Sequence, residues 1–398
     1  SLKVYEGDFI CIMGPSGSGK STTLFTISGI HKPHSGKIYF GDRDVTGLEP
    51  EELGIGLVFQ NYALYPHMTV RENILFPLKN LKWDKAEAEK RAVEVAVSGM
   101  HNIALIGAPG TGKTMLAQCI PGIMPKLTFS ERMEISKVYS VAGLLNKENP
   151  VVQKRPFRSP HHTVTQTALA GGGRYPKPGE VSLASGGVLF LDELPEFQRQ
   201  VLEVMRQPLE DGYVNVSRLE GSYRYPAKFQ LTAALNPCKC GYYPDRKKCT
   251  CSQGQIKNYL GRISKPLLDR IDIFTETIIL KYGEISNSDK GENSYNVRKR
   301  IEKVHHIQKE RYKNDGILFN SELSAGMIKR YCVMDNEAKE YLENIFENME
   351  FSARAYHKVL KTARTIADMD ESGEIKRKHI SEAVCYRTAD KKYWGVTM

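Results

Sequence analysis

The residues best suited to chemistry in this sequence lie between Gly107 and Thr114, in the stretch GAPGTGKT. The stretch fits the pattern G-x-x-x-x-G-K-[ST], in which backbone N–H groups cradle the phosphates of a nucleotide. Gly107, Gly110 and Gly112 form the glycine-rich turn, and Lys113 would reach the terminal phosphates. The Thr114 hydroxyl would bind Mg²⁺. These residues predict a P-loop that binds ATP and Mg²⁺.

A second stretch of the same kind runs from Gly14 to Ser21, GPSGSGKS, and offers Gly14, Gly19, Lys20 and Ser21 to a nucleotide. The two stretches are separated by fewer residues than two complete nucleotide-binding domains of ordinary size would need. We therefore expect one of the two domains to be incomplete.

Two adjacent carboxylates follow a strongly apolar run in the middle of the chain. The run 188–191 predicts a buried strand, and it delivers Asp192 and Glu193 at its end. Metal-assisted cleavage of a phosphoanhydride needs such a pair, because one carboxylate orients the Mg²⁺ shell and the other polarises the attacking water. We assign the first role to Asp192 and the second to Glu193.

Two further polar residues could complete this site. The apolar run FQLTAALNPC ends in Asn236, which could position water or could serve only as a turn residue. In GRISKPLLDRIDIF, Arg270 is a candidate for an arginine that a neighbouring subunit supplies to the charge developing on the transferred phosphoryl group.

Four cysteines are clustered in a basic stretch, at Cys238, Cys240, Cys249 and Cys251. Four thiolates that converge across a short loop suit a tetrahedral structural Zn²⁺, and a cytosolic setting disfavours disulfides. The C-x-C spacing is tighter than the usual C-x-x-C, so reduced loop thiols without a metal remain the alternative.

A histidine pair, His161 and His162, follows Ser159-Pro160 in a glycine-rich region. Neither an acid nor a cysteine flanks the pair, so a metal site is disfavoured there. We interpret the pair as part of a loop or of an insert facing a pore.

The elements that must position these residues follow from the hydrophobic pattern. The runs 103–106 and 188–191 and the run ending at 236 predict buried parallel strands, with a helix after the second P-loop. Beyond residue 280, four amphipathic stretches predict a helical lid. The fold class is thus α/β, with domains at 1–97, 98–282 and 283–398.

Composition limits the class of protein. The 398 residues are 41% hydrophobic and 26% charged, which is typical of globular chains. With neither a signal peptide nor an apolar run long enough to span a bilayer, we expect a soluble, cytoplasmic protein without direct membrane insertion. The net charge of +10 allows nucleic acid as a partner. Because the first residue is Ser1, we expect that an upstream part is missing.

The first quarter of the chain, including GPSGSGKSTTL and IGLVFQNYALYPHMTVRENI, resembles the ATP-binding subunits of ABC transporters that power solute uptake. By this resemblance Gln60 senses Mg²⁺ and the attacking water. The family's LSGGQ signature, catalytic glutamate and switch histidine have no counterpart after Val97. We therefore expect at most weak phosphate binding at Lys20 and Ser21, no hydrolysis and no membrane partner. The truncated sheet should leave apolar faces poorly covered.

The remaining three quarters, including RSPHHTVTQTALAGGGRYPKPGEVSLASGGVLFLDELPEF and ALNPCKCGYYPDRKKCTCS, resembles the ComM/YifB group of magnesium-chelatase-like AAA+ ATPases. The resemblance implies an AAA+ fold, a hexameric ring and ATP-driven work on DNA, as a helicase or in branch migration. It assigns Walker A to Lys113 and Thr114, Walker B to Asp192 and Glu193, sensor 1 to Asn236, the arginine finger to Arg270 and sensor 2 to Arg354.

The chain thus combines an inert ABC remnant with a nearly complete AAA+ motor. The simplest account is the joining of two unrelated genes, by recombination or by an error of assembly; the alternative is a natural protein with two ATPase domains. For function, the alternatives are a chelatase-like motor acting on a protein partner, the ATP-binding subunit of an uptake transporter, and an interaction module that does not hydrolyse ATP.

Overall fold

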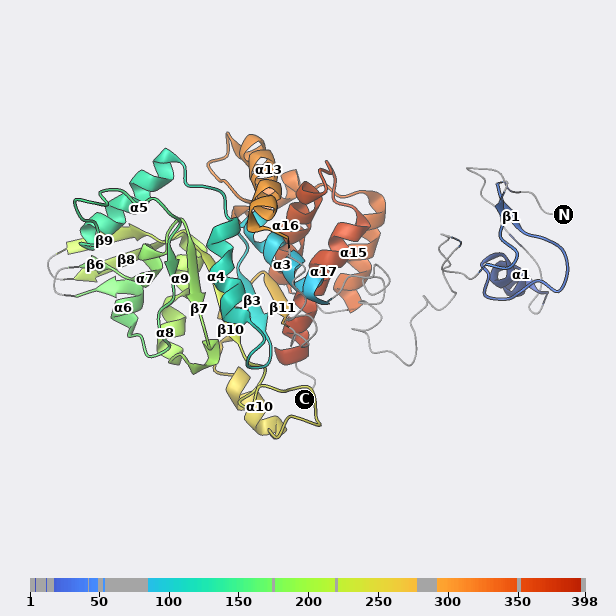
Figure 1. Cartoon of the computed structure of the whole chain (residues 1–398), viewed down its shortest axis with the longest axis horizontal. Coiled ribbons are helices and arrows are strands. Elements are labelled where there is room, and N and C mark those ends of the chain that lie inside the picture. The colour runs from blue at the N-terminus through green and yellow to red at the C-terminus, as the bar shows by residue number, and fades with distance from the viewer. Residues whose placement is uncertain are drawn as a thin grey trace. The chain divides into compact units, whose positions relative to one another are not determined.

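The computed structural model describes residues 18–41, 43–48, 85–173, 176–218, 221–277, 292–348 and 352–394, together with Val4, Ile12 and Leu53. Contacts within the chain divide it into two units, residues 1–73 and residues 74–398. Each unit is described by itself below (Figure 1).

The first unit begins, in its described part, with the turn that leads into helix α1 (Lys20–Ile27). A two-stranded antiparallel sheet follows, made of β1 (Tyr39–Phe40) and β2 (Arg43–Asp44). Leu24 and Ile30 expose 47% and 44% of their surface. The expectation that apolar strand faces are poorly covered concerns strands outside the described residues and stays a prediction. The predicted strands around residues 9–13 and before Gln60 lie outside the described residues.

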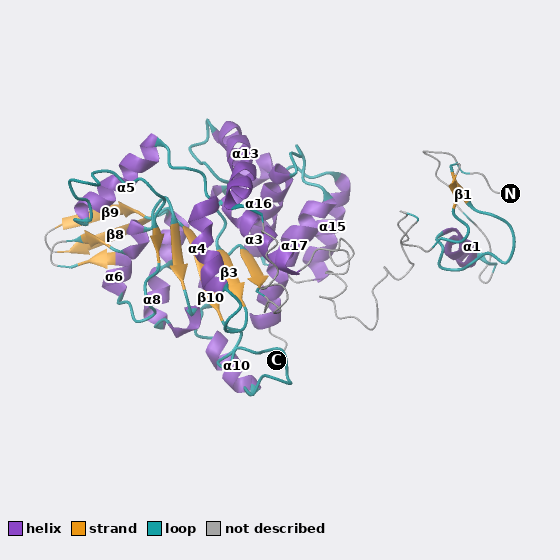
Figure 2. Cartoon of the chain, in the orientation of Figure 1, coloured by secondary structure: helices purple, strands orange, loops and turns teal. Residues whose placement is uncertain are grey.

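The second unit is built on a five-stranded sheet whose order is β11-β3-β10-β7-β4. All four pairings are parallel, so the predicted α/β class with a parallel core is confirmed (Figure 2). The strand bounds are β3 (Ile103–Ile106), β4 (Phe157–Arg158), β7 (Val188–Leu191), β10 (Gln230–Leu235) and β11 (Ile273–Glu276).

Helices cover both faces of this sheet, because successive side chains of each strand point to opposite sides. Ile103 and Leu105 pack in one hydrophobic cluster, and Ala104 and Ile106 pack in the other. The first cluster contains α3 (Lys85–Gly99), α4 (Lys113–Ile123) and most of the C-terminal helices. The second contains residues of α6 (Gln166–Ala170), α7 (Glu180–Leu183), α8 (Arg199–Val204), α10 (Gln253–Leu260) and α11 (Lys265–Leu268).

Short elements complete this core. Helix α5 (Phe129–Val141) starts with a capping box between Thr128 and Glu131. Two antiparallel pairs project from the second unit, namely β5 (Gly171–Gly172) with β6 (Lys177–Pro178), and β8 (Tyr213–Arg218) with β9 (Gly221–Pro226). The turns η2 (Leu194–Glu196) and η3 (Asn320–Glu322) and the helix α9 (Arg206–Asp211) lie between larger elements.

In the predicted helical lid, the described residues from 292 onward form five helices. They are α13 (Ser294–Tyr312), α14 (Ala325–Tyr331), α15 (Asn336–Asn348), α16 (Ala353–Met369) and α17 (Arg377–Trp394). Asp368 of α16 is 1% exposed and accepts hydrogen bonds from Arg311 and Arg364. Arg311 of α13 thereby links α16 to a neighbouring helix, whereas Arg364 pairs with the same buried carboxylate within α16. Of the described helices, none combines the length and apolar composition that crossing a membrane requires.

The junction helix α3 belongs to the second unit. Ala92, Val95 and Val97 are fully buried in the cluster that also holds α13 and α16. The predicted boundary after Val97 cuts through this helix, whereas the structure keeps its whole alanine- and valine-rich face in the second core. The reason is that this face packs against α4 and β11 of the second unit as well as against the C-terminal helices α13 and α16.

The base of the sheet contains a buried histidine whose protonation opposes folding. His101 is fully buried, its Nε2 lies 2.7 Å from Thr365 Oγ1, and burial lowers its pKa to about 4. The folded state therefore binds a proton less readily than the unfolded chain, in which the imidazole pKa is about 6.5. Stability is thus retained above about pH 6.5 and lost as the pH falls toward 4.

We expect His101→Gln to flatten this part of the pH dependence. Between pH 7 and pH 5 the wild-type chain should lose about 2 kcal/mol more of its unfolding free energy than the variant, because the glutamine does not titrate. Urea unfolding followed by circular dichroism at the two pH values measures the difference. Equal losses in the two proteins would contradict the assignment.

Candidate nucleotide site and cysteine cluster

The second P-loop has the backbone shape that phosphate binding needs. It leaves β3 at Ile106 and enters α4 at Lys113. Gly110 and Gly112 have φ angles of 78° and 80°, which residues other than glycine rarely adopt. The loop therefore turns sharply and aims the N-terminus of α4 at the space above the sheet, where an anion is favoured.

Lys113 lies inside the turn of the P-loop. Its Nζ donates to the carbonyl oxygens of Gly107 and Ala108 at 2.8 and 2.9 Å and to Asn236 Oδ1 at 3.2 Å. Burial lowers the pKa of Lys113, although the negative charge of Asp192 opposes this shift. The side chain is 9% exposed, so its ammonium group is oriented by the protein rather than by water.

The Mg²⁺ residues predicted from the sequence meet in the structure. Thr114 Oγ1 donates to Asp192 Oδ2 at 2.8 Å, although 78 residues separate them in the chain. A hydroxyl and a carboxylate are hard oxygen ligands of the kind that Mg²⁺ takes beside substrate phosphates. The donor set therefore fits Mg²⁺, with Thr114 and Asp192 as the residues that would hold it.

Glu193 occupies an unusual backbone position next to this pair. It is exposed and has a φ of 51°, in the left-handed region, which costs on the order of 1 kcal/mol for a residue other than glycine. Its Oε2 lies 3.5 Å from Nδ1 of His162, whose ring contacts that of His161. Sequence reasoning missed this contact and assigned the histidine pair to a loop or a pore. No local pattern in the sequence indicates this contact, because it depends on the parallel pairing of β4 with β7, which brings the chain after β4 to the edge that carries Glu193.

Asn236 lies where the sequence predicted it, directly after β10. The register pairs Leu235 with Ile106, so Asn236 stands beside the start of the P-loop. Its amide oxygen accepts from Lys113, which places a polar group next to the terminal phosphates that Lys113 is expected to bind.

The two predicted arginines lie near each other at the end of the sheet where the parallel strands begin, opposite the end that carries the P-loop. Arg270 precedes β11, and its buried guanidinium is paired with Glu210. Arg354 Nη1 lies 3.5 Å from Asp269 Oδ2. Arg354 thus lies beside the amino end of β11, and its assignment as sensor 2 remains a prediction.

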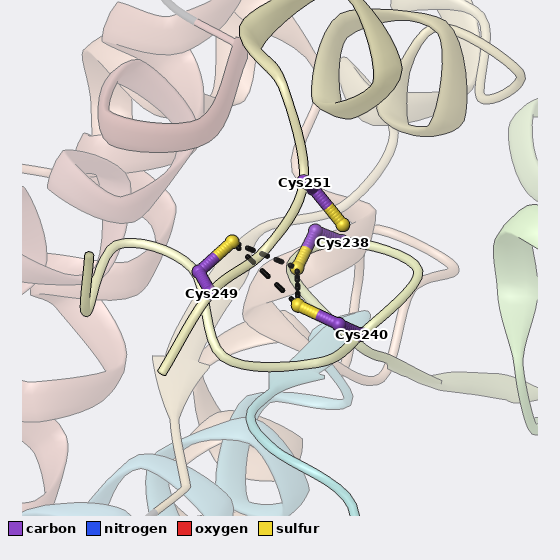
Figure 3. Close-up of side chains that lie close together, drawn as sticks. All are labelled: Cys238, Cys240, Cys249 and Cys251. Carbon is purple, nitrogen blue, oxygen red and sulfur yellow. Dashed lines mark hydrogen bonds between the residues drawn. The ribbon is translucent and has the colours of Figure 1, made fainter. Parts of the chain in front are cut away.

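The four predicted cysteines form one cluster (Figure 3). Their sulfur atoms all lie within 4.8 Å of one another. Cys238 Sγ is 3.3 Å from Cys240 Sγ and 3.8 Å from Cys249 Sγ, and the last two are 3.6 Å apart. All four are free thiols. Tetrahedral Zn–S bonds of about 2.3 Å separate the sulfurs by about 3.8 Å, so the cluster fits a zinc ion.

The first P-loop is described only around its lysine. Gly19 has a φ of 83° and precedes α1, and Lys20 Nζ donates to Ser18 Oγ at 3.3 Å. Gly14, Gln60 and the side chain of Ser21 lie outside the described residues, so their predicted contacts with nucleotide remain predictions.

Comparison with known families separates the two parts of the chain. The family model of magnesium chelatase, subunit ChlI, matches residues 81–285, and the model of the ChlI C-terminal part matches residues 291–387. The model of the ABC transporter family matches residues 1–102. The two assignments overlap in the region of α3, which the structure packs in the second unit.

Individual relatives show the same division. Competence protein ComM of Haemophilus influenzae is 45% identical over 300 residues, which are 75% of this chain and 58% of that protein. Protein YifB of Salmonella typhimurium is 42% identical over 306 residues, 77% of this chain and 59% of that protein. The sn-glycerol-3-phosphate import ATP-binding protein UgpC of Rhizobium meliloti is 54% identical over 98 residues, 25% of this chain and 28% of that protein. The chain thus spans less than two thirds of the length of these relatives.

Two glycine substitutions test the shape of the second P-loop. Gly112→Ala should lower the unfolding free energy by about 1 kcal/mol and weaken nucleotide binding, because alanine is strained at a φ of 80°. Gly122→Ala, near the other end of α4 in open space, should raise stability by about 0.5 kcal/mol, because alanine favours a helix. Urea unfolding and titration with a fluorescent ATP analogue measure both effects. Equal behaviour of the two variants would contradict the assigned geometry.

Proposed function

From residue 81 onward the chain belongs to the magnesium chelatase family, and we propose on this basis that it is a Mg²⁺-dependent ATPase motor of the ComM/YifB type. The observation that carries the proposal is the meeting of Lys113, Thr114, Asp192 and Asn236 at one edge of the sheet. These residues come from the ends of three neighbouring parallel strands, where α/β proteins bind their ligands.

The residues divide the work of hydrolysis as follows. Lys113 and the backbone N–H groups of the P-loop bind the phosphates of ATP. Thr114 and Asp192 would hold Mg²⁺, which would supply positive charge to the phosphate oxygens. Glu193 orients the attacking water and accepts its proton, and Asn236 aligns the same water with the terminal phosphate. The ATP phosphoanhydride is thereby cleaved to ADP and phosphate.

We also propose that the site is completed by a second copy of the chain in a hexameric ring. Arg270 and Arg354 lie at the amino edge of the sheet, whereas Lys113 lies at the carboxyl edge. Neither arginine can therefore serve the nucleotide of its own chain without a large rearrangement. In a ring, they reach the ATP bound by the neighbouring subunit and stabilise the charge that develops on the transferred phosphoryl group.

We propose DNA as the partner on which the motor acts, through helicase or branch-migration activity. The proposal rests on the similarity to competence protein ComM and on the net charge of +10. The alternative is a protein partner, which the match to the magnesium chelatase subunit favours. A role as the ATP-binding subunit of an uptake transporter is the weaker alternative, because that similarity ends near residue 102.

A structural Zn²⁺ is the third proposed ligand of the chain, after ATP and Mg²⁺. Cys238, Cys240, Cys249 and Cys251 would hold it, in accordance with the spacing of their sulfur atoms. We propose a cytoplasmic location for the protein, where thiols remain reduced and available to a metal.

Substitution of the two P-loop lysines, one at a time, tests which of the two P-loops supports ATP hydrolysis. Lys113→Ala should abolish ATP turnover, because the neighbouring Thr114 contacts the carboxylate of Asp192. Lys20→Ala should leave turnover unchanged, because the ABC catalytic glutamate has no counterpart in the sequence after Val97. Glu193→Gln should bind ATP normally but hydrolyse it about a hundredfold more slowly or worse. Steady-state phosphate release by the purified chain measures turnover. Loss of activity in Lys20→Ala alone would assign the reaction to the first unit.

The partner is tested by adding DNA to the same assay. We expect branched DNA to stimulate phosphate release several-fold, and we expect the stimulation to fall with rising salt because phosphate contacts release counterions. The Lys113→Ala variant serves as the control for contaminating ATPases. If DNA has no effect at any salt concentration, the protein-partner alternative is favoured.

A further inference from the structure

The end of β10 and the residue after it form hydrogen bonds with the P-loop. The backbone N–H of Gly107 donates to the carbonyl oxygen of Leu235 at 3.2 Å. One residue later, Asn236 Oδ1 accepts from Lys113 Nζ at 3.2 Å. The last residue of β10 therefore holds the first residue of the P-loop, and the residue after β10 holds its lysine.

The cysteine loop then touches the P-loop at a third position. Gly241 lies so close to Pro109 that a Cβ on Gly241 would be 2.3 Å from Pro109 Cδ, well inside van der Waals contact. Gly241 also has a φ of 84°, and its N–H donates to the carbonyl oxygen of Cys238 at 3.0 Å. The turn from Cys238 to Gly241 therefore contacts the P-loop directly at Pro109.

The sulfur atoms join the two ends of this loop. From residue 242 to residue 248 all side chains are exposed except that of Tyr243, which is half-buried and packs against Tyr393. Backbone hydrogen bonds such as that from Cys249 N–H to the carbonyl oxygen of Asp245 form local turns within it. Cys238 and Cys249 are buried and bring residues 238–240 next to residues 249–251, so whatever holds the four sulfur atoms together contributes to the shape of the loop.

We infer that a thiophilic divalent cation of the zinc class, bound by the four cysteines, holds the P-loop in its phosphate-binding shape and so sets the affinity of the chain for nucleotide. The inference rests on the zinc site proposed above and adds a consequence to it. Metal binding fixes the turn from Cys238 to Gly241, and this turn holds Gly241 against Pro109 of the P-loop. Residues 235–236, which lead into the turn, hold Gly107 and Lys113 through hydrogen bonds. Loss of the metal releases the turn and loosens the phosphate cradle.

The first experiment compares the full chain as purified, after removal of zinc with a chelator that spares Mg²⁺, and after zinc is added back. Zinc content is measured by elemental analysis, and nucleotide affinity by titration with a fluorescent ATP analogue. We expect one zinc ion per chain, an affinity about tenfold lower after its removal, and recovery on reloading. Circular dichroism shows whether the stripped chain remains folded.

A matched pair of glycine variants tests the contact without removing a ligand. Gly241→Ala should keep its zinc but bind the ATP analogue about tenfold more weakly, because the added methyl group displaces Pro109. Gly316→Ala carries a similar backbone strain at a φ of 70°, but no atom lies within 4 Å of the added methyl group, so it should change neither quantity. Cys251→Ser should lose the zinc and show the same weakening as the stripped wild-type chain.

The outcomes separate this inference from the proposals on which it depends. If zinc is bound but neither its removal nor Gly241→Ala changes affinity, the coupling is overturned and the zinc site stands. If the wild-type chain retains no zinc and gains no affinity from added zinc, the zinc site and the coupling are both overturned. If affinity depends on zinc while ATP is not hydrolysed, the coupling is supported and only the motor function fails.

Discussion

The register of three parallel strands is the constraint on which the nucleotide site depends. β10 pairs Leu235 with Ile106 of β3, and it pairs Ala233 with Leu191 of β7. The loops that follow these strands therefore begin at one edge of the sheet, although they are far apart in the chain. A slip of one residue in either pairing would turn the strand's side chains to the opposite face and separate the groups that meet there.

The same register underlies the proposal that a second copy of the chain completes the site. Residues before β11 lie at the opposite edge of the sheet, so Arg270 and its neighbour Asp269 are remote from the P-loop. The C-terminal helices are attached at this amino edge, where His101 contacts Thr365 and where Lys358 pairs with Asp272. The attachment is buried and partly ionic, so breaking it would leave charges without partners. Completion of the site by a second copy needs no such break.

Local patterns in the sequence predicted the groups that lie close to their own strands. The P-loop, Asp192 and Asn236 each follow an apolar run directly, so recognising the run places the residue at the carboxyl edge. The cysteine cluster was also predictable, because its four members lie within one short loop. The lid was predicted as helices, since each of its segments carries a regular apolar stripe that the structure buries.

Contacts between distant segments were not predictable in this way. The approach of His162 to Glu193 requires knowledge that β4 is the neighbour of β7, and the approach of Gly241 to Pro109 requires the path of a loop without regular structure. The position of Arg354 depends on how the whole lid docks, and α3 joined the second unit because its buried face matches helices about 200 residues later. In each case the determining information lies in packing between elements.

The two P-loops show what a local motif can and cannot establish. Gly19 and Gly112 have nearly equal φ angles, 83° and 80°, and each precedes a helix that starts with lysine. The backbone conformation of this turn is therefore set by the residues of the turn itself. Among the described residues of the first unit, however, strands are limited to the short β1 and β2 pair, whereas Lys113 is surrounded by groups from β7 and β10. A glycine-rich turn can form on its own, but catalysis requires the parallel sheet that brings a carboxylate and an amide to it.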